Sequence, residues 1–550
     1  MKQIYLIIIA AALLMSCSDF LKTENLIEKD SASFPVNAAD YYTALMGCYA
    51  PLTTNLYDQN PFIVAEVMAD YRLGGGGPID MKIRAINEFK KTSDDMFDNL
   101  WTRNYKGINR ANFLLENETH VVWDNEQQRK KMVGQAYFLR AYYYLELCRL
   151  FGTVPLTTQT QAKNMPKASA DQLFGQIASD LKQAIELLPA TPISSIPANE
   201  LGLATKWAAQ ALMGRAYLFY AGYYKKSEIS LPDGGIVNKA TVASWIDDCI
   251  ANSAHKLVND YRNLWGYSYS NKDYGYAKNN KLQWIGETGA NTETVFAIKF
   301  SALGSNTTDS YHNSIHLYFG WKNQDRIPFG KGWGFGPVNP MLFREWPSND
   351  LRKKASIIDL EDPDEGISGY KYTGTKQMQE TKYWQKKNMP VTVYDAAGKI
   401  VNISCELYGR SPNFQYDNAL DLVVIRFADV LLMGAELEST QAQKYFDAVR
   451  ARAGLENIPV SLENIKRERL YELAFEGERY FDLLRWGDIE EAFAKLTEIP
   501  IMNEGVPLKV TIRYRPETKG FLQIPNKEIN LSDGILTQNE GWIGSDMLYN

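Results

Sequence analysis

The sequence carries the stretch Val133-Gly134-Gln135-Ala136-Tyr137 and repeats it as Met213-Gly214-Arg215-Ala216-Tyr217. Each copy opens a segment rich in Leu and Tyr, with Ala141 and Ala221 at matching positions. Glycine and alanine at positions i, i+2 and i+7 leave one side of a helix nearly bare, so a neighbouring helix can approach closely. The two glycines are 80 residues apart, which fits two helix-turn-helix units of about 34 to 40 residues each. The repeat therefore predicts stacked helix pairs of the tetratricopeptide type.

Apolar residues at helical spacing extend this array on both sides of the repeat. We expect helices over residues 38–50, 97–115, 127–151, 170–188, 204–224, 242–257, 428–437, 441–453 and 462–486. Pro155, Pro189 and Pro192 fall where the preceding helices should end. These segments predict a mainly α-helical protein with a tetratricopeptide-like scaffold over residues 37–260 and 421–490.

The helical period fades between about residues 261 and 420, where Gly, Pro, Asn, Asp and aromatic residues dominate. Short β-like runs occur there, such as residues 294–300. A segment of roughly 160 residues is too long for one disordered loop in a compact protein. We therefore expect a loop-rich, aromatic-rich lobe inserted into the scaffold, formed by residues 261–420 and 491–550. Loops carried on a rigid frame are where ligands usually bind.

The first residues predict export and a lipid anchor. Lys2 precedes an apolar run from Ile4 to Met15, which is shorter than the ~20 residues that a membrane span needs and is typical of a cleaved signal peptide. Leu14-Met15-Ser16-Cys17 resembles a bacterial lipobox. We expect a signal peptide over residues 1–16, a lipidated Cys17 and a tether to residue 36. Acyl chains bind a membrane with ~0.8 kcal/mol per buried CH₂, so the mature chain is expected outside the cytoplasm and held at a membrane.

Composition excludes some functions. The formal net charge of the 550 residues is −6, the sequence pI is about 5.6 and no dense Lys/Arg block occurs, so nucleic-acid binding is not expected. Cys48, Cys148, Cys249 and Cys405 lack CxxC spacing, which favours buried free thiols over disulfides or a metal site. His312 and His316 are four residues apart but lack an evident third ligand. We expect no metal and no cofactor.

Aromatic residues make up 12% of the chain, and many gather in the expected lobe. Trp265-Gly266-Tyr267-Ser268-Tyr269 alternates strictly, which predicts an extended segment with three rings on one side. A neutral sugar offers an apolar C–H face and hydroxyl groups, so its sites combine an exposed ring with polar side chains. The candidate ligand-binding residues in the lobe are Trp265, Tyr267, Tyr269, Tyr274, Trp284, Trp321, Arg326 and Trp333. Packing in the lobe's own core is the alternative for each ring.

A further candidate for the ligand site is the segment Asp70-Tyr71-Arg72-Leu73 with the glycines at 74–77. The glycines lack the strand-loop-helix context of a phosphate cradle, which excludes nucleotide binding. Asp70 and Arg72 remain as candidate polar contacts, with a plain surface connection as the alternative.

Considered by itself, the sequence RERLYELAFEGERYFDLLRWGD at residues 467–488 predicts a helix with charged residues at i, i+4 spacing, followed by a packed turn. As a string it resembles the C-terminal hallmark of the SusD/RagB family of outer-membrane nutrient-binding lipoproteins. Further blocks agree in order: WTRNYKGINRAN at 101–112, AYFLRAYYY at 136–144, IRFADVLLMGAE at 425–436 and VRARAGL at 449–455. Asp429 stands where the family more often has Glu, and Glu540 where its closing motif usually has Pro.

This resemblance implies a tetratricopeptide-like scaffold with an irregular ligand-binding lobe, no catalytic activity and a place in the outer membrane. It also implies a partner, a TonB-dependent (SusC-like) transporter, and an oligosaccharide as the usual cargo, with peptides or other nutrients for some members. In related proteins the loop after the first helices borders the ligand site, which adds weight to Asp70 and Arg72. Two other functions stay open: a surface glycoside hydrolase that uses Glu66 with Asp70 as its carboxylate pair, and a purely structural adaptor.

Overall fold

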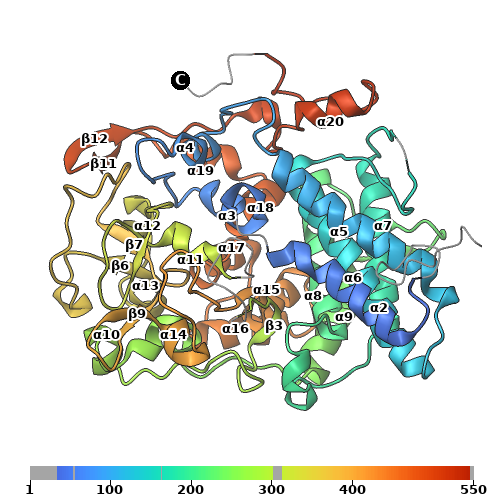
Figure 1. Cartoon of the computed structure of the whole chain (residues 1–550), viewed down its shortest axis with the longest axis horizontal. Coiled ribbons are helices and arrows are strands. Elements are labelled where there is room, and N and C mark those ends of the chain that lie inside the picture. Colours follow the sequence, from blue (N-terminus) through green and yellow to red (C-terminus); the bar gives the residue numbers. More distant parts are fainter. Residues whose placement is uncertain (1–33, 54–55, 163, 302–311, 545–550) are drawn as a thin grey trace, which may run out of the picture.

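The computed structural model describes residues 34–53, 56–162, 164–301 and 312–544 (Figure 1). The expected signal peptide, Cys17 and most of the tether lie outside the described residues. Within the described ranges no helix has the length and apolar character that crossing a membrane requires. Figure 1 shows long helices on one side of the molecule and short helices and strands on the other.

Long helices from the first half of the chain form the scaffold. They are α2 (Ala38–Tyr49), α5 (Asp98–Asn117), α6 (Glu126–Phe151), α7 (Ala170–Leu187), α8 (Lys206–Tyr224) and α9 (Lys239–Asn252). From α5 to α9 each helix packs against the next along the chain. Local sequence sets the helix ends, since Ser169 and Gln172 form a capping box at α7. The tetratricopeptide-like helical scaffold is thus confirmed, with ends that differ from the predicted ones by a few residues.

The repeated glycines lie at close helix contacts. A Cβ atom at Gly134 of α6 would lie 2.9 Å from Cγ of Leu188, just past the end of α7. A Cβ atom at Gly214 of α8 would lie 3.0 Å from Cδ1 of Ile246 in α9. Both distances are too short for a larger side chain without movement of the neighbour, so the expected close approach is confirmed.

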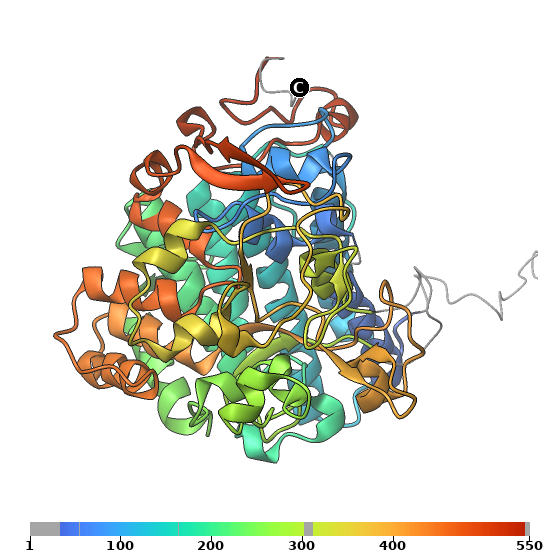
Figure 2. The same cartoon turned by 90° about the vertical axis from the view of Figure 1, so that its left-hand side faces the viewer.

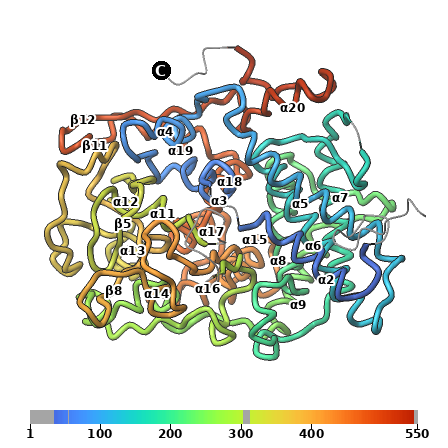
Figure 3. The backbone as a smooth tube through the Cα atoms, viewed as in Figure 1, coloured from blue at the N-terminus to red at the C-terminus, as the bar shows by residue number. Residues whose placement is uncertain are grey.

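The chain returns to the scaffold after the lobe. The later helices are α15 (Phe427–Glu436), α16 (Ala442–Arg452), α17 (Leu462–Glu472), α18 (Arg479–Trp486), α19 (Ile489–Ala494) and α20 (Asn526–Leu531). Helix α18 packs on α8, and α15 packs on α9. The last part of the C-terminal segment, which was expected in the lobe, lies on the scaffold instead: Leu522 donates its N–H to Leu150 O of α6 at 2.8 Å, and Asn526 donates to Asp94 O at 3.1 Å. Figure 3 shows α20 above α5 accordingly.

The prediction of one helix over residues 462–486 is wrong, because the chain breaks between α17 and α18. Phe475 and Gly477 have φ angles of 68° and 85° in the break. Their backbone N–H groups bond to side chains from another segment instead of to a helix carbonyl. Phe475 donates to the Tyr71 hydroxyl at 3.0 Å, and Gly477 donates to the Glu66 carboxylate at 2.8 Å.

The lobe consists of short elements (Figure 2). Its helices are α10 (Gly275–Asn279), α11 (Ser314–Phe319), α12 (Pro340–Glu345), α13 (Leu351–Ser356) and α14 (Ile403–Tyr408). Its strands are β3 (Thr294–Ile298), β4 (Trp321–Lys322), β5 (Lys331–Gly332), β6 (Ile357–Asp359), β7 (Tyr383–Gln385), β8 (Thr392–Tyr394), β9 (Ile400–Asn402) and β10 (Leu422–Arg426). Two further hairpins, β1 (Glu228–Ser230) with β2 (Ile236–Asn238) and β11 (Ile499–Asn503) with β12 (Val506–Val510), lie outside residues 261–420. Every sheet in the described ranges has two strands, so side-chain packing must supply most of the lobe's cohesion.

Buried ion pairs join the lobe to the scaffold. Glu472 of α17 accepts from Arg426 at 2.9 Å and from Arg352, which the lobe helix α13 contributes, at 3.0 Å, and it also pairs with Arg452. Arg426 reaches Glu293, just before β3, at 2.6 Å. Burial by itself would raise the pKa of Glu472, but the guanidinium groups of Arg452, Arg426 and Arg352 hold it well below its usual range. The charges at this junction are therefore matched.

The predicted free thiols are confirmed. Cys48, Cys148 and Cys249 are buried and Cys405 is half-buried, all without a disulfide. Burial raises the pKa of the Cys48 thiol to about 12, so it is unreactive at neutral pH.

Candidate functional site

A groove of about 270 Å³ opens on the lobe between residues 268–273, Trp284 and the β8–β9 hairpin. Three aromatic side chains line it: Tyr269, Trp284 and Tyr394. Tyr394 is 50% exposed, and the other two are half-buried. The structure thus brings together two residues that the sequence identified as candidates, Tyr269 and Trp284, and adds a third ring.

Short-range contacts position these rings. Tyr269 lies in the 3₁₀ helix η7 (Gly266–Ser270), and its ring meets that of Trp284 edge to face, with centroids 6.1 Å apart. The neighbours of Trp284 are fixed by Asn263, whose side chain accepts from Gln283 N at 2.8 Å and whose carbonyl accepts from Ile285 N at 3.0 Å. The hydroxyl of Ser270 donates to Thr392 O at 3.0 Å. This last bond ties the segment that carries Tyr269 to strand β8.

The rim of the groove is polar. Its polar residues are Asn271, Lys272, Asp273, Gln283 and Glu406. Burial, and then the nearby carboxylate of Glu406, which accepts a hydrogen bond from Tyr269, raise the pKa of the Tyr269 hydroxyl. Lys272 and Asp273 are exposed. A ring surface beside amide, ammonium and carboxylate groups can stack on a sugar's C–H face and bond to its hydroxyls.

The structure places the other early candidates differently. The prediction that residues 265–269 form an extended segment with three rings on one side is wrong. The chain forms the 3₁₀ helix η7 there, directly after a second 3₁₀ helix, η6 (Tyr261–Leu264). Trp265, Tyr267 and Tyr274 are buried in the core of the lobe. Lys387 lies 4.6 Å from the centroid of the Trp265 ring. These three rings pack in the lobe core, which corrects the prediction that they contact a ligand in the groove; Trp265 also lines a cavity between the lobe and the scaffold.

Trp321 is also a core residue, fully buried against Phe329 with ring centroids 5.9 Å apart. Arg326 donates to Gly369 O at 2.5 Å and to Asp325 O at 3.1 Å, so its guanidinium holds a loop of the lobe. Trp333 is half-buried and meets Tyr318 edge to face at 5.1 Å. Tyr318, Trp321, Trp333 and Phe335 form a second aromatic cluster, in which Trp333 alone keeps an accessible ring.

Asp70 and Arg72 take part in ion pairs. The fully buried guanidinium of Arg72 donates to Glu66 at 2.9 and 2.6 Å and to Gly336 O at 2.8 Å. Asp70 accepts from Arg479 at 2.9 and 2.7 Å. Arg72 is thus corrected as a ligand contact, and Asp70 is committed to Arg479. Glu66 and Asp70, the carboxylates of the hydrolase alternative, are both held by arginines and are not an open pair.

The glycine loop nevertheless lies against the second aromatic cluster. Gly75 forms a β-bridge with Phe335, and a Cβ atom at Gly75 would lie 2.4 Å from Gly334 O. Glycine is required at this contact because no side chain fits. Lys322 then pairs with Asp80 at 3.1 Å. The loop therefore leads to the surface around Trp333, which stays a second candidate position for a ligand.

Sequence reasoning missed Tyr394, Gln283 and Glu406. Tyr394 begins a tight turn, Asp395-Ala396-Ala397-Gly398, and an aromatic residue next to a hairpin turn could have marked it as exposed. Glu406 carries no such signal, because only the packing of α14 beside Tyr269 brings it to the groove.

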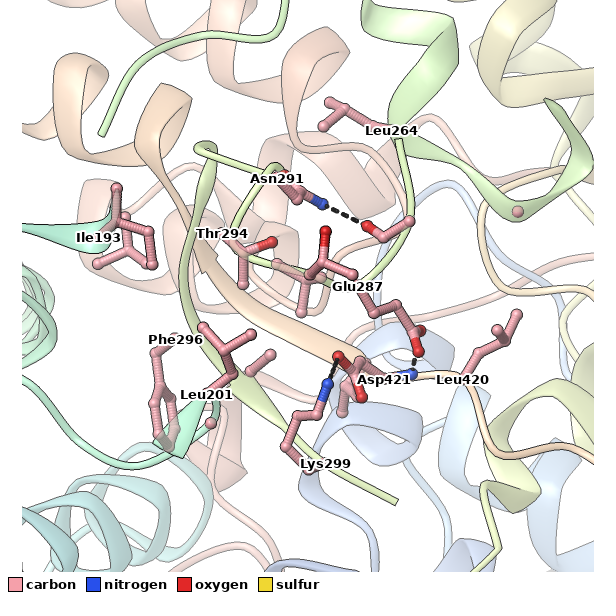
Figure 4. Close-up of a pocket in the computed structure, with 18 of the residues that line it drawn as sticks. Ile193, Leu201, Leu264, Glu287, Asn291, Thr294, Phe296, Lys299, Leu420 and Asp421 are labelled. Atoms are coloured by element: carbon pink, nitrogen blue, oxygen red, sulfur yellow. Dashed lines mark hydrogen bonds and ion pairs between the residues drawn. The ribbon is translucent and has the colours of Figure 1, made fainter. Parts of the chain in front are cut away.

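A second cavity of about 100 Å³ lies at the seam between the lobe and the scaffold (Figure 4). Ile193 and Leu201 line it from the scaffold side, and Leu264 and Leu420 from the lobe. Trp284 lines this seam cavity as well as the groove.

The polar corner of the seam cavity contains two carboxylates. Glu287 accepts from the N–H of Asp421 at 2.6 Å and from the hydroxyl of Tyr408 at 2.5 Å. Lys299 pairs with Asp421 (Figure 4). Burial raises the pKa of Glu287, and burial followed by the charge of Glu287 raises that of Asp421. Aliphatic, aromatic and charged side chains all line the seam cavity, and its volume of about 100 Å³ is smaller than the groove's volume of about 270 Å³.

Comparison with known proteins places the chain. A family model described as starch-binding and associating with the outer membrane matches residues 36–218, and the SusD family model matches residues 292–542. A SusD-like protein of Formosa agariphila is 24% identical over 539 residues, which cover 93% of this chain and 94% of that protein. A SusD-like protein of Bacteroides ovatus is 24% identical over 516 residues, which cover 88% and 83% respectively.

Solved structures agree with this placement. A laminarin-binding SusD-like protein superposes with a TM-score of 0.72 at 25% identity, covering 92% of this chain and 100% of that one. Surface glycan-binding protein A of Bacteroides thetaiotaomicron, solved with laminarihexaose, gives a TM-score of 0.69 at 20% identity over 91% of this chain and 98% of that one. This chain belongs to the SusD/RagB family.

Proposed function

We propose that this member of the SusD/RagB family captures a neutral oligosaccharide in the groove lined by Tyr269, Trp284 and Tyr394. The observation that carries the proposal is the grouping of three accessible rings around a groove with a polar rim. Such a surface matches the apolar face and the hydroxyl groups of a pyranose. The laminarin binding named for one structural relative makes laminarin oligosaccharides the first ligands to test.

The role extends to delivery. The chain is held at the outer membrane by the lipid on Cys17, faces the cell exterior and passes its cargo to a TonB-dependent (SusC-like) transporter. The lipobox-like start of the sequence and the family support this arrangement. The family and its relatives here are named for binding, so capture without catalysis is the role proposed.

Calorimetry tests the capture step. The mature chain without Cys17 is titrated with laminarin oligosaccharides, and a glycan array extends the search to other polymers. Trp284→Ala is expected to weaken binding by at least about tenfold, equal to ~1.4 kcal/mol. Trp245→Ala is the matched control, since Trp245 is a half-buried tryptophan on the scaffold helix α9. Equal affinities of the two variants would refute the assigned site.

Two further measurements separate the alternatives. If Trp333→Ala abolishes oligosaccharide binding and Trp284→Ala keeps the native affinity, the site lies instead on the surface beside the glycine loop. A peptide array tests the other cargo class, and peptide hits without glycan hits would replace the oligosaccharide.

Co-purification tests the delivery step. The full-length protein is extracted from its native membrane in mild detergent, and a TonB-dependent barrel is expected to accompany it. Cys17→Ala should release the protein from the membrane. Absence of any barrel partner would contradict delivery and leave capture unaffected.

A further inference from the structure

A second groove of about 360 Å³ lies on the other side of the β8–β9 hairpin. Pro390, Thr392, Ile400 and Asn402 border it from the hairpin, and Phe414 faces them from a neighbouring loop. We propose that the two grooves and the hairpin between them form one extended surface that binds a single unbranched neutral oligosaccharide. The inference rests on the proposed function and defines the ligand further, as a chain longer than one groove can hold.

Strand register places the two grooves side by side. Thr392 pairs with Asn402, Val393 with Val401, and Tyr394 with Ile400. Val393 and Val401 are buried in the lobe core, so Tyr394 and Ile400 lie on the opposite, outer face of the hairpin.

This pair spans the ridge between the grooves. Tyr394 lines the first groove and Ile400 lines the second. Adjacent strands lie ~4.8 Å apart, so a ligand that leaves the first groove over Tyr394 reaches Ile400 directly. Figure 3 labels β8 beside α14 at this edge of the lobe.

The second groove offers the same chemistry as the first. Phe414 is 37% exposed, and the ammonium group of Lys331 lies 4.5 Å from its ring centroid. Asn402 accepts from Ser404 N at 2.9 Å through its Oδ1, and within the described ranges its amide nitrogen donates to no protein atom. That amide can therefore donate to a ligand hydroxyl.

Charge in the second groove favours a neutral ligand. Asp325 and Asp417 face Lys331 across it. Burial raises the pKa of both carboxyl groups, that of Asp417 to about 7. Lys331 thus lies among two carboxyl groups whose neutral forms burial favours, so a neutral sugar is the ligand that this charge arrangement suits best.

Hydrogen bonds hold the hairpin on both sides. Ser270 of the first groove donates to Thr392 O at 3.0 Å. On the other side Thr392 N donates to Pro328 O at 2.7 Å, and Gly330 N donates to Pro390 O at 2.8 Å. The two grooves are thus fixed relative to each other, and a ligand that spans both loses little free energy to ordering them.

Affinity as a function of chain length tests the surface. Calorimetry is carried out with laminarin oligosaccharides from the disaccharide to the hexasaccharide. We expect affinity to rise with length in the native protein. Phe414→Ala should lower the affinity for the hexasaccharide by roughly threefold to tenfold, which is what one aromatic contact contributes. The same variant should leave the affinity for the disaccharide unchanged. Trp284→Ala should lower the affinity for both the disaccharide and the hexasaccharide.

Two further variants test whether the ligand crosses the hairpin between the grooves. Ile400→Arg places a bulky charged side chain on the ridge, and should reduce hexasaccharide affinity to that of a ligand confined to the first groove. Tyr42→Ala removes a comparably exposed ring, 41% accessible on α2, and should change nothing.

The outcomes are distinct from those for the proposed function. Equal affinity for short and long ligands, or a length dependence that survives both Phe414→Ala and Ile400→Arg, overturns the extended surface while capture at the first groove stands. Absence of binding at every length on every glycan overturns both.

Discussion

The scaffold and the lobe both bury tryptophan, but they treat its N–H group differently. In the scaffold Trp207 of α8 donates its indole N–H to Thr191 O at 2.7 Å. In the lobe the indole N–H groups of Trp265, Trp321 and Trp346 find no acceptor among the described protein atoms. A buried donor without a partner costs about 1–3 kcal/mol. The lobe is therefore expected to be the less stable region.

This difference shows why the lobe needs its frame. Two-stranded sheets are marginal by themselves, and the lobe depends on ion pairs such as those of Arg352 with Glu468 and Glu472 of α17. The long helices keep their backbone bonds within themselves. The scaffold thus supplies stability, and the lobe supplies accessible loops with aromatic side chains.

The largest expected effect comes from breaking the junction. Glu472→Ala leaves Arg352, Arg426 and Arg452 without their shared carboxylate, and should lower the free energy of unfolding by roughly 3–5 kcal/mol. Urea denaturation measures it. Glu463→Ala, at an exposed residue of the same helix whose pairing distance to Arg467 is 4.0 Å, should change stability by less than about 0.5 kcal/mol. Similar values for the two variants would contradict the role of the junction.

The next effect separates the two cores. Trp321→Ala should cost about 3 kcal/mol because it empties the centre of the lobe. Hydrogen exchange should then accelerate in the lobe while helices α5 to α8 keep their protection. Trp207→Ala should instead accelerate hydrogen exchange in the scaffold helices, while the lobe keeps its protection. Uniform acceleration in both variants would show that the regions unfold as one unit.

A pH effect is expected where the lobe meets the β11–β12 hairpin. Glu380 donates its N–H to Met502 O at 2.8 Å, and its buried carboxyl accepts from Tyr370. Burial, with a smaller contribution from Glu504, raises the pKa of Glu380 from 4.5 to about 8. The neutral form is favoured in the folded state, so this stabilising contribution is fully present below pH 4.5 and is lost as the pH rises towards 8.

Glu380→Gln should remove that dependence, because the amide stays neutral and can still accept from Tyr370. The variant should match the native protein near pH 4.5 and exceed its unfolding free energy by on the order of 1–3 kcal/mol at pH 9. Denaturation curves across this range check it. A constant difference at all pH values would show that the carboxyl does not titrate there.

The smallest effect tests a corrected residue. Asp70→Asn weakens the pair with Arg479, which should cost roughly 0.5–2 kcal/mol of stability and leave oligosaccharide affinity unchanged. Calorimetry beside thermal denaturation separates the two. A loss of affinity in a fully folded Asp70→Asn variant would return Asp70 to the ligand site.

Much of the scaffold was predictable because helices are encoded locally. Apolar spacing gave α6 and α7 to within one residue at each end, and the repeated glycines marked the close contacts of Gly134 and Gly214. The break between α17 and α18 could not be predicted. It depends on Glu66 and Tyr71, about 400 residues earlier in the chain, which accept the N–H groups of the break.

The candidate site was predictable only in part. Composition located the aromatic lobe, and two of the three groove rings, Tyr269 and Trp284, were among the candidates. The neighbouring rings Trp265 and Tyr267 looked equivalent, since alternation along a short segment cannot tell which residues face a core. The 3₁₀ turns of that segment and the packing of Lys387 over Trp265 decided it.

By itself the sequence determined the family, the helical scaffold, the free thiols and the position of the aromatic lobe, because periodicity, cysteine spacing and contiguous motifs are properties of the chain. Only the tertiary structure decided which rings are accessible, that Arg72 is committed to Glu66, and that two grooves flank one hairpin. Those features arise where segments distant in the sequence meet, and the free energy that fixes them comes from burial and charge pairing between such segments.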